Sequence, residues 1–394
     1  MKKNILYISW DGILEPLGQS QILSYIKHLS INFNFYLISF EKKRDYKNIK
    51  NFNEISLVCN KLGIKWFRLN YSQNIPFISN LLNLIKCFFL SFYIILRYKI
   101  NLIHSRSYPS AFIGLLCKKI FKIKLIFDMR GFWIDEKVDA GLWKKKSFIY
   151  NYGKKIEKLL IKNSDVIISL SENGKIELNN IFGGIIPPIF VIRTCTDLKK
   201  FTPKIQRKNA LTTLGYVGNV KGWYLFEPVL NFYQYFKNKQ NNSVLRIFNI
   251  TDHEYIKKIV EKFNFDENDI ILEKCSFSNI PNEMKKIDIG IFFIQKSFSK
   301  KASCATKLGE FLATGIPIIT NDGIGDHSEI LLKSKTGIIL KKFDNYNMKK
   351  SVDSINNLLN DSNLSKRCQK VSRDFFSLEA GVKTYLKVYN SLLQ

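Results

Sequence analysis

Short apolar runs alternate with amphipathic stretches along the whole chain. The runs are bounded by polar or turn-forming residues, which is typical of buried strands in parallel sheets. In the first half of the chain they lie at residues 5–10, 35–39, 64–68, 102–105, 124–128 and 166–170. Helical periodicity fits residues 19–29, 78–98, 109–120 and 143–163. This order of strands and helices predicts a doubly wound α/β domain.

The alternation restarts after residue 190. A strand end at 191–192 is followed by a polar stretch and then by a new strand that runs into a glycine turn at 215–218. Further strands are expected at 243–250, 270–273, 287–294, 316–320 and 337–340, and two amphipathic helices at 346–360 and 379–393. The 394 residues exceed what one core usually supports. We predict an N-terminal domain at 1–192, a linker at 193–209, a C-terminal domain at 210–375 and a final helical segment at 376–394.

Composition narrows the class of protein. An apolar fraction of 46% is that of a packed globular protein. The net charge of +28 favours anionic partners, which are phosphates, acidic lipids or nucleic acids. Seven dispersed cysteines without a Cys-x-x-Cys pair suggest reduced thiols in a cytoplasmic protein. The longest apolar run, 87–96, is about half a membrane span, so we expect no transmembrane segment.

Residues 299–320 give the clearest indication of a binding site. They read as a loop of small residues, a short helix, a Gly-Ile-Pro stop and a buried strand. Open N–H groups and the helix dipole favour an anion at the start of such a helix, and Lys300, Lys301 and Lys307 add positive charge. Glu310 follows one turn later, where its carboxylate would accept hydrogen bonds from a ribose diol. The segment therefore predicts a nucleotide site that binds both phosphate and sugar.

Five motifs in chain order resemble those of bacterial family 4 glycosyltransferases. They lie at residues 17–21, 128–133, 194–203, 215–218 and 299–317. The resemblance covers essentially the whole chain and implies the GT-B fold: two facing Rossmann-like doubly wound domains and a last helix that crosses back to the first domain. In this family the C-terminal domain holds most of the donor nucleotide, and the N-terminal domain holds the acceptor.

The same resemblance implies an activity. A sugar would pass from a nucleoside diphosphate sugar, linked to UDP or GDP, to a glycan or lipid-linked acceptor, with retention of anomeric configuration. The biological role would be the assembly of capsule, lipopolysaccharide O-antigen or another surface polysaccharide.

The family's E-x7-E motif is only half present. Glu310 takes the place of its second glutamate, which binds the nucleotide ribose in relatives, whereas the first glutamate would fall at Ala302. Because that first glutamate contacts the transferred sugar in relatives, Lys300, Ser303 or Lys307 would have to replace it here. A simpler interpretation of Glu310 is a solvent-facing helix carboxylate.

The glycine turn of the second half also departs from the family. Relatives carry an arginine and a lysine there that neutralise the leaving pyrophosphate, while here Asn219 replaces the arginine and Lys221 only loosely replaces the lysine. Gly18 and Gly218 are expected where backbone approaches the diphosphate, although either is also explained by a tight turn. The predicted donor-binding residues are Gly18, Gly218, Asn219, Lys221, Lys300, Ser303, Thr306, Glu310 and Gly323.

Arg130, Asp128 and Lys307 are the predicted catalytic residues. Arg130 lies near the place of a histidine in relatives and, since arginine stays protonated, it would stabilise donor charge or position the acceptor rather than act as a base. Asp128 and Arg130 could equally form a structural ion pair, and Lys307 could be an exposed helix lysine. The chain has no Asp-x-Asp motif, so charge would be stabilised by lysines, backbone amides and a helix dipole, and we expect neither a metal nor another cofactor.

A basic amphipathic segment at 143–162 and the apolar stretch 81–96 lie in the first half. Such segments dock on anionic membranes, although a core-facing stripe with a solvated lysine face is the more common arrangement. We therefore expect a cytoplasmic protein, peripheral to the inner face of the plasma membrane.

Two rival functions follow from the same sequence. The positive charge suggests a nucleic-acid-binding protein, but the lysines are dispersed and no RNA- or DNA-binding motif occurs, so nucleic acid is not an expected partner. Ala302 motivates the second rival, a nucleotide-sugar-binding protein without turnover.

Overall fold

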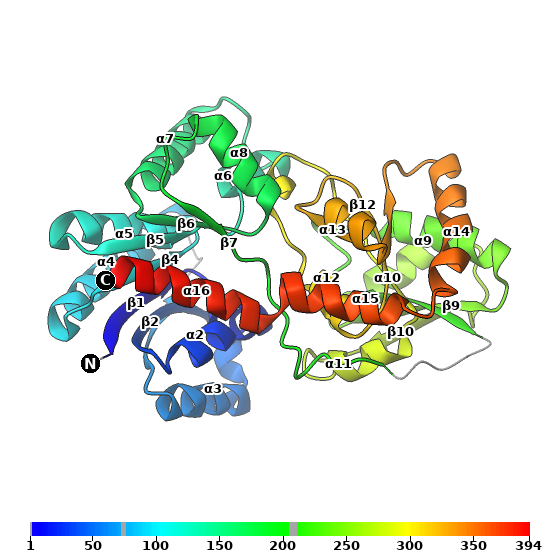
Figure 1. Cartoon of the computed structure of the whole chain (residues 1–394), viewed down its shortest axis with the longest axis horizontal. Coiled ribbons are helices and arrows are strands. Elements are labelled where there is room, and N and C mark those ends of the chain that lie inside the picture. The colour runs from blue at the N-terminus through cyan, green and yellow to red at the C-terminus, as the bar shows by residue number, and fades with distance from the viewer. Residues whose placement is uncertain (1, 72–75, 205–210) are drawn as a thin grey trace. The chain divides into compact units, whose positions relative to one another are not determined.

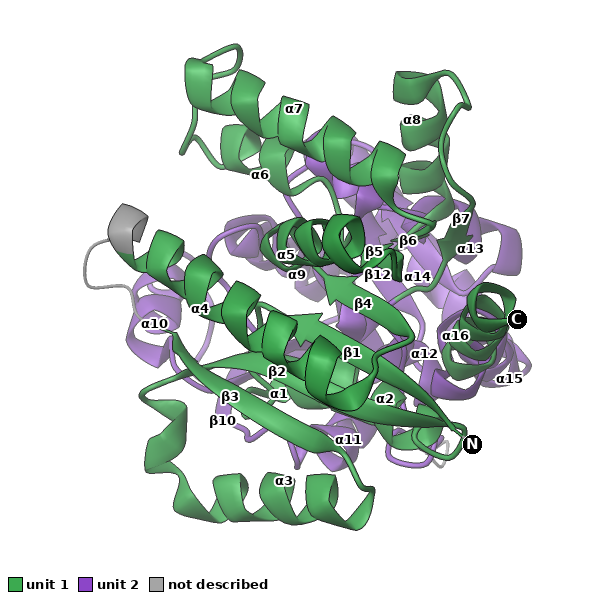
Figure 2. Cartoon of the chain, turned by 90° about the vertical axis from the view of Figure 1, so that its left-hand side faces the viewer, with its two compact units in different colours: residues 1–193, 381–394 green, residues 194–380 purple. Residues whose placement is uncertain are grey.

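The computed structural model describes residues 2–71, 76–204 and 211–394 (Figure 1). Residues 205–209 of the predicted linker lie outside the described residues. The chain forms two compact units, shown in different colours in Figure 2. Unit 1 comprises residues 1–193 and 381–394, and unit 2 comprises residues 194–380. Each unit is built on one parallel sheet covered by helices, which confirms the predicted class of two Rossmann-like α/β domains.

The sheet of unit 1 has seven strands in the order β3-β2-β1-β4-β5-β6-β7. They are β1 Lys3–Ser9, β2 Phe33–Lys42, β3 Lys65–Tyr71, β4 Leu102–Arg106, β5 Lys124–Asp128, β6 Val166–Ser169 and β7 Ile189–Val191. All neighbouring strands pair in parallel, and Ile5 of β1 lies between Phe35 and Leu102. The central strands are buried on both faces, as their continuous apolar sequences require.

Helices cover both faces of this sheet. They are α1 Pro16–Gly18, the π-helical turn Gln19–Leu23, α2 Ser24–Leu29, α3 Ile49–Lys61, α4 Pro76–Tyr98, α5 Tyr108–Phe121, α6 Trp133–Asp139, α7 Phe148–Asn163 and α8 Glu172–Phe182. In Figure 2, α4, α5 and α7 lie along one face of the sheet and α3 lies on the other. The helix predicted from residue 143 begins only at Phe148, because the Ser147 hydroxyl accepts the Tyr150 N–H and caps it, and Lys146 takes a φ of +65°.

The sheet of unit 2 has six parallel strands in the order β10-β9-β8-β11-β12-β13. They are β8 Thr212–Val217, β9 Ser243–Asn249, β10 Ile270–Lys274, β11 Ile289–Ile291, β12 Ile318–Asn321 and β13 Gly337–Leu340. The strand predicted at 287–294 is reduced to β11, since beyond it the Ile294 N–H donates to the side chain of Asn321 in β12 and not to a backbone carbonyl of that strand. The helices are α9 Phe226–Lys239, α10 His253–Val260, α11 Ile280–Glu283, the 3-10 turn Ser299–Ala302, α12 Thr306–Ala313, α13 His327–Ser334, α14 Asn345–Leu359 and α15 Leu364–Val371.

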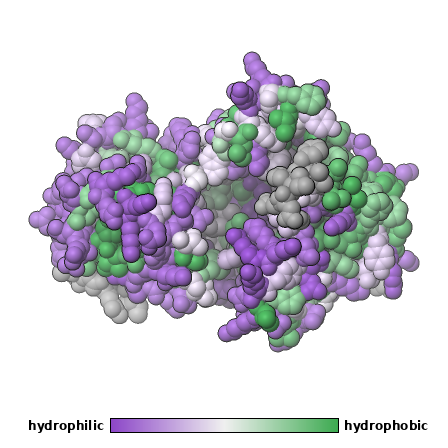
Figure 3. All heavy atoms as spheres, turned by 180° about the vertical axis from the view of Figure 1, so that it is seen from behind, coloured by the Kyte–Doolittle hydropathy of each residue, from purple (hydrophilic) through white to green (hydrophobic). Residues whose placement is uncertain are grey.

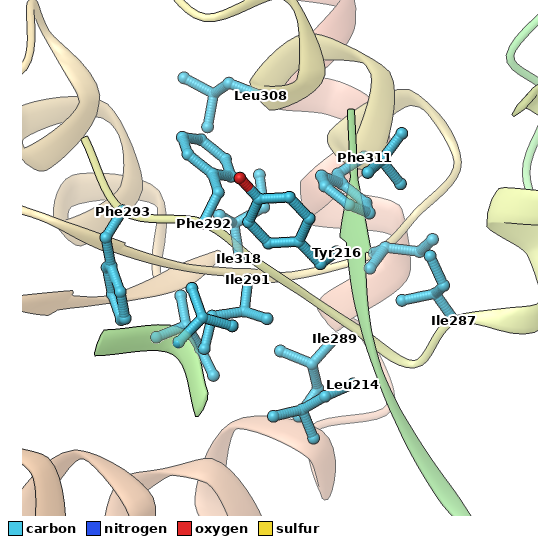
Figure 4. Close-up of a cluster of buried hydrophobic side chains, with 14 of the residues drawn as sticks. Leu214, Tyr216, Ile287, Ile289, Ile291, Phe292, Phe293, Leu308, Phe311 and Ile318 are labelled. Carbon is cyan, nitrogen blue, oxygen red and sulfur yellow. The ribbon is translucent and has the colours of Figure 1, made fainter. Parts of the chain in front are cut away.

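Helix α12 lies directly on this sheet because glycine makes room for it. A β-carbon at Gly290 of β11 would lie 2.8 Å from the ring of Phe311. Figure 4 shows Leu308 and Phe311 of α12 gathered with Tyr216, Phe292 and Ile318 in the core of unit 2. This packing fixes the first turn of α12 near the carboxyl ends of β8 and β11.

The last helix, α16, spans Leu378–Leu393, and its residues from 381 onward group with unit 1. Tyr385 and Tyr389 are fully buried within unit 1, where Tyr389 stacks edge-on against Phe33 at a centroid distance of 5.2 Å.

Candidate functional site

The candidate site in unit 2 centres on the ammonium group of Lys307, in the first turn of α12. The side chain is buried, and its Nζ has no hydrogen-bond partner among the described residues. Three aromatic rings surround it, with their centroids 3.9 Å (Tyr224), 4.8 Å (Tyr216) and 5.4 Å (Phe292) from Nζ. These cation–π contacts compensate only part of the lost hydration. Burial therefore lowers the pKa of Lys307 to about 7, although Glu310 opposes the shift.

The glycine turn after β8 lies against this ammonium group. Gly218 has a φ of +96°, and a β-carbon at this position would lie 3.5 Å from Lys307 Nζ. The turn is held in place by the Gly218 N–H, which donates to the Phe248 carbonyl, and by the Asn249 amide, which donates to the Gly218 carbonyl. The structure thus brings together Gly218 and Lys307, two of the residues predicted to contact the donor.

Glu310 lies one turn further along α12 and is half-buried. Burial raises the pKa of its carboxyl group to about 7, and the charge of Lys307 opposes that shift. Burial, reinforced by the Glu310 charge, also raises the pKa of the Tyr224 phenol to about 12. Lys307, Glu310 and Tyr224 therefore form one electrostatically coupled cluster, which we call the Lys307 cluster.

The start of α12 has no side-chain cap. Its N-cap residue is Ala305, which provides no side-chain hydrogen bond to the first turn, where Thr306 and Lys307 lie. The Ala305 N–H itself faces His327 Nε2 at 3.4 Å. The positive end of the helix dipole and the ammonium group of Lys307 thus lie on the same turn, an arrangement that attracts anions.

The segment before α12 is fastened to the loop that follows β12. Lys300 is buried with its Nζ 3.7 Å from the centroid of the Trp223 ring, and its carbonyl accepts the Gly325 and Ser303 N–H groups. Gly323 has a φ of +86°, and a β-carbon there would lie 2.7 Å from the Lys296 side chain. Gly323 is thus required by the loop itself.

Two predicted donor contacts lie apart from the Lys307 cluster. Lys221 is half-exposed, forms an ion pair with Asp252 at 2.7 Å and lies over the ring of Tyr255. Asn219 is exposed, and its carbonyl accepts a hydrogen bond from the Tyr216 hydroxyl. Neither side chain forms a hydrogen bond with the ammonium group of Lys307.

In unit 1 the predicted residue Asp128 is fully buried at the end of β5. Its Oδ2 accepts a hydrogen bond from the Tyr385 hydroxyl at 3.0 Å and lies 3.5 Å from His104 Nε2, while its Oδ1 lies 3.7 Å from Arg130. Burial raises the pKa of Asp128, but Arg130 and His104 outweigh that effect and hold the pKa at about 2. We call these four residues together with Tyr389, whose hydroxyl lies 2.6 Å from His104 Nδ1, the Asp128 cluster.

Arg130 is the solvent-facing member of the Asp128 cluster. Its side chain is 12% exposed, and its backbone has a φ of +58°, which is uncommon for a residue other than glycine. The following residue, Gly131, also has a positive φ. The loop after β5 thus holds the guanidinium beside Asp128 at some conformational cost.

The need for glycine at position 18 is explained by close packing that the sequence did not reveal. It lies in the helical region of the backbone, within α1, and a β-carbon there would lie 1.9 Å from the Gly12 carbonyl oxygen. The same loop is ordered by Glu41, a buried carboxylate that accepts the Ile13 and Leu14 N–H groups at 2.9 and 3.1 Å.

Several residues in or near the two clusters were not predicted from the sequence. Tyr224 and Trp223 directly follow the glycine turn, and aromatic residues at such a position are a usable signal for a lined cation site. Tyr385 and Tyr389 repeat at a helical spacing of four on the last helix, but nothing in their spacing identifies Asp128 or His104 as partners. Glu41 lies within an apolar strand, where a carboxylate needs buried donors.

A family model matches most of unit 2. Residues 199–375 match the model of the family described as glycosyl transferases group 1. The whole chain is 23% identical, over 98% of its length and 97% of the relative's, to a protein of Methanocaldococcus jannaschii described as an uncharacterized glycosyltransferase.

Solved structures support the fold over the full length. Sucrose-phosphate synthase from Thermosynechococcus elongatus superposes with a TM-score of 0.75 at 14% identity, covering 99% of both chains. A glycosyltransferase from Rickettsia africae gives a TM-score of 0.73 at 16% identity, covering 100% of this chain and 99% of the other. HepE from Anabaena, solved with UDP and glucose, gives 0.70 at 11% identity, covering 98% and 99%. The chain therefore has the fold of the GT-B glycosyltransferases, and its residues 199–375 match the glycosyl transferases group 1 family.

Proposed function

We propose that the protein is a glycosyltransferase that takes a sugar from a nucleoside diphosphate sugar, with the diphosphate bound at the Lys307 cluster of unit 2. The observation that carries the proposal is the buried Lys307 ammonium, which lacks a hydrogen-bond partner among the described residues. A diphosphate oxygen would supply the missing acceptor and regain the desolvation free energy. HepE, which has a similar fold, was solved with UDP and with UDP-glucose.

The residues of the cluster suggest distinct tasks. Lys307 and the first turn of α12 would neutralise the diphosphate as it departs, Gly218 would let the backbone approach it, and Glu310 would accept hydrogen bonds from the ribose. In the reaction the bond between the anomeric carbon and the diphosphate breaks, and the acceptor hydroxyl oxygen forms the new bond while losing its proton. Catalysis of this kind depends on positioning and on stabilising the leaving charge.

For unit 1 we propose a role on the acceptor side, with a glycan or a lipid-linked glycan as acceptor and Arg130 as the group that orients it. Support comes from the resemblance to retaining transferases of surface polysaccharide assembly and from the partial exposure of Arg130 at the carboxyl end of the sheet. Retention of configuration, metal-independent transfer and a cytoplasmic location belong to the same proposal.

The test is a donor screen with purified full-length protein. UDP- and GDP-linked sugars are added singly, and thermal unfolding and release of nucleoside diphosphate are measured. A ligand that binds only the folded chain raises the unfolding temperature by mass action. Glu310→Ala should weaken nucleotide binding, whereas Glu227→Ala, an exposed carboxylate on α9 in an ion pair with Lys262, should not. No stabilisation by any nucleotide, or equal binding by Glu310→Ala, would overturn the assignment.

A second candidate, a nucleotide-sugar-binding protein without turnover, is favoured by one observation. Ala302, which stands at the first position of the glutamate motif, is buried in the 3-10 turn before α12 and brings no polar group to the site. Saturable binding of a nucleotide sugar with no product on any glycan acceptor would favour this candidate over the transferase.

A further inference from the structure

Over most of helix α4 of unit 1, small and polar side chains are buried and large apolar side chains are exposed. The face turned to the domain interior holds Asn83, Cys87 and Ser91, and only near its end the apolar Ile94 and Ile95, all of which are buried. The outer face holds large apolar side chains, which include Phe89 at 65%, Leu96 at 60% and Tyr93 at 53% exposure. A soluble domain normally buries the large apolar face of a surface helix.

The outer apolar face is continuous rather than scattered. Leu82, Ile85, Phe89, Tyr93 and Leu96 repeat every three or four residues, so they lie along one side of α4, and Leu81 is exposed beside them. Phe92 of α4 contacts Phe121 at the end of α5 with a centroid distance of 4.9 Å, and the exposed Ile120 lies next to it in the chain. Figure 3 shows hydrophobic residues gathered at the right-hand edge, the end at which α4 and α5 lie when Figure 1 is turned. Contiguous exposed apolar surface of this kind marks an interaction site.

Helices α4, α5 and α7 add positive charge and almost no negative charge, whereas α6, which packs against α7, carries three acidic residues. Together α4, α5 and α7 contain eight lysine or arginine residues and one acidic residue, Glu157, which is buried and accepts a hydrogen bond from Tyr108. At the start of α7, Phe148 is 86% exposed and stacks in parallel with Tyr152, directly after three exposed lysines at 144–146. Apolar rings can insert at the boundary of the acyl chains, and flanking lysines can bind the anionic headgroups above it.

A basic hollow lies at the end of the same helical layer. It has a volume of about 320 Å³ and is lined by Leu115, Lys118, Lys119, Lys122, Ile123, Lys124, Asn163 and Asp165. Lys118 and Lys124 pair with Asp165, whereas Lys119 and Lys122 form no ion pair with any carboxylate in the part of the chain that the structure describes. Two ammonium groups are thus available to a phosphate headgroup beside the apolar face.

We propose that the α4–α5–α7 face of unit 1 binds an anionic phospholipid bilayer, with the α4 rings in the interfacial region and the lysines on the headgroups. The helix lies in the membrane plane rather than across it. By length and composition the window Ser79–Tyr98 qualifies as a membrane span, and 28% of it is buried. However, the buried side of α4 packs on the sheet of unit 1 through Cys87, Ile94 and Ile95, so a spanning arrangement would require the helix to leave the fold.

The bilayer inference is independent of the proposed transfer reaction and is tested without a substrate. Full-length protein is mixed with vesicles of phosphatidylcholine alone or of phosphatidylcholine with phosphatidylglycerol, and the bound fraction is measured by co-sedimentation. We expect binding to the anionic vesicles that weakens as salt is raised. The double variant Phe89→Ser/Tyr93→Ser should bind about tenfold more weakly or worse, because two inserted rings are lost. Removing Lys119 and Lys122 by alanine substitution should cost about fivefold for each lysine.

A matched control lies on the opposite face of the same sheet. Ile49→Ser in α3 replaces a residue that is 68% exposed and should leave vesicle binding unchanged. All substituted α4 residues are exposed, so thermal unfolding should stay at the wild-type temperature; Leu96→Ser provides a second probe if the double variant unfolds early.

Three outcomes would overturn the inference. The first is no binding of wild-type protein to anionic vesicles, and the second is wild-type affinity in both α4 variants. The third is a lipid-free dimer that the α4 substitutions dissociate, because a second copy of the chain would then be the occupant of this face.

Discussion

The Asp128 cluster of unit 1 and the Lys307 cluster of unit 2 both lie at the carboxyl ends of a parallel sheet. They differ in the groups that surround the buried charge. Asp128 has a tyrosine hydroxyl, a histidine and an arginine around it. Lys307 has three aromatic rings, and in the described residues its ammonium group finds no hydrogen-bond acceptor. The first arrangement surrounds the charge with polar groups, although Asp128 Oδ1 and His104 Nε2 also lack a hydrogen-bond partner among the described residues, whereas the second surrounds it with aromatic rings. From this contrast we expect a structural role for the Asp128 cluster and ligand binding at the Lys307 cluster.

The largest expected effect is the loss of the Asp128 carboxylate. Asp128→Ala leaves Arg130 without its neighbouring counter-charge and removes the acceptor of the Tyr385 hydroxyl. We expect the free energy of unfolding to fall by about 3–5 kcal/mol, measured by urea denaturation. Glu227→Ala is the control, since its carboxylate and the Lys262 ammonium with which it pairs are both more than half exposed, and it should cost less than about 1 kcal/mol. Equal losses in the two variants would remove the structural role given to the Asp128 cluster.

Lys307→Met, unlike Asp128→Ala, should not lower the free energy of unfolding. The variant keeps an apolar stem among the rings but removes the desolvated charge, so stability should stay the same or rise. Nucleoside diphosphate affinity should fall by about a hundredfold, because a buried counter-charge is lost. Calorimetry measures the affinity and urea denaturation the stability, with Lys262→Met, an exposed lysine of unit 2, as the control. A clear loss of stability together with unchanged affinity would make Lys307 a structural residue.

The pH dependence of stability and of affinity gives a third test of the role proposed for the Lys307 cluster. Burial places the pKa of Lys307 at about 7, against 10.5 for an exposed lysine, so above pH 7 the folded chain releases a proton that the unfolded chain retains. The stability of the wild type should therefore rise relative to Lys307→Met as pH increases from about 7 to 10. Nucleoside diphosphate affinity should fall in the same range, by up to about tenfold per pH unit, since the uncharged amine attracts no anion. Affinity that stays constant from pH 7 to 9 would contradict this.

The smallest effect concerns the contact from the last helix. Tyr385→Phe removes the hydroxyl that donates to Asp128 while preserving the ring and its edge-on contact with Tyr25. Unfolding free energy should drop by about 1 kcal/mol, the usual net value of such a hydrogen bond. Nucleotide affinity should be unaffected. A change in affinity of tenfold or more would couple this contact to the donor site and weaken the distinction between the clusters.

Local sequence patterns were enough to predict the two-domain α/β class and most of the strands. The strand predicted at 124–128 coincides with β5, and the one at 337–340 coincides with β13, because short apolar runs flanked by polar residues have few alternatives in a parallel sheet. The E-x7-E resemblance directed attention to residues 299–317, where Lys307 and Glu310 lie on one turn of α12. The assigned roles of the individual site residues remain predictions.

The sequence alone could not tell which lysine is desolvated. Lys221 and Lys307 belong to a chain with many lysines, yet Lys221 pairs with Asp252 and Lys307 is enclosed by rings from β8, the loop after it and the residue after β11. Nor could periodicity decide which side of α4 is covered, because that helix has apolar residues all round. Burial and charge pairing depend on neighbours that are distant in the chain, so only the tertiary structure determined them.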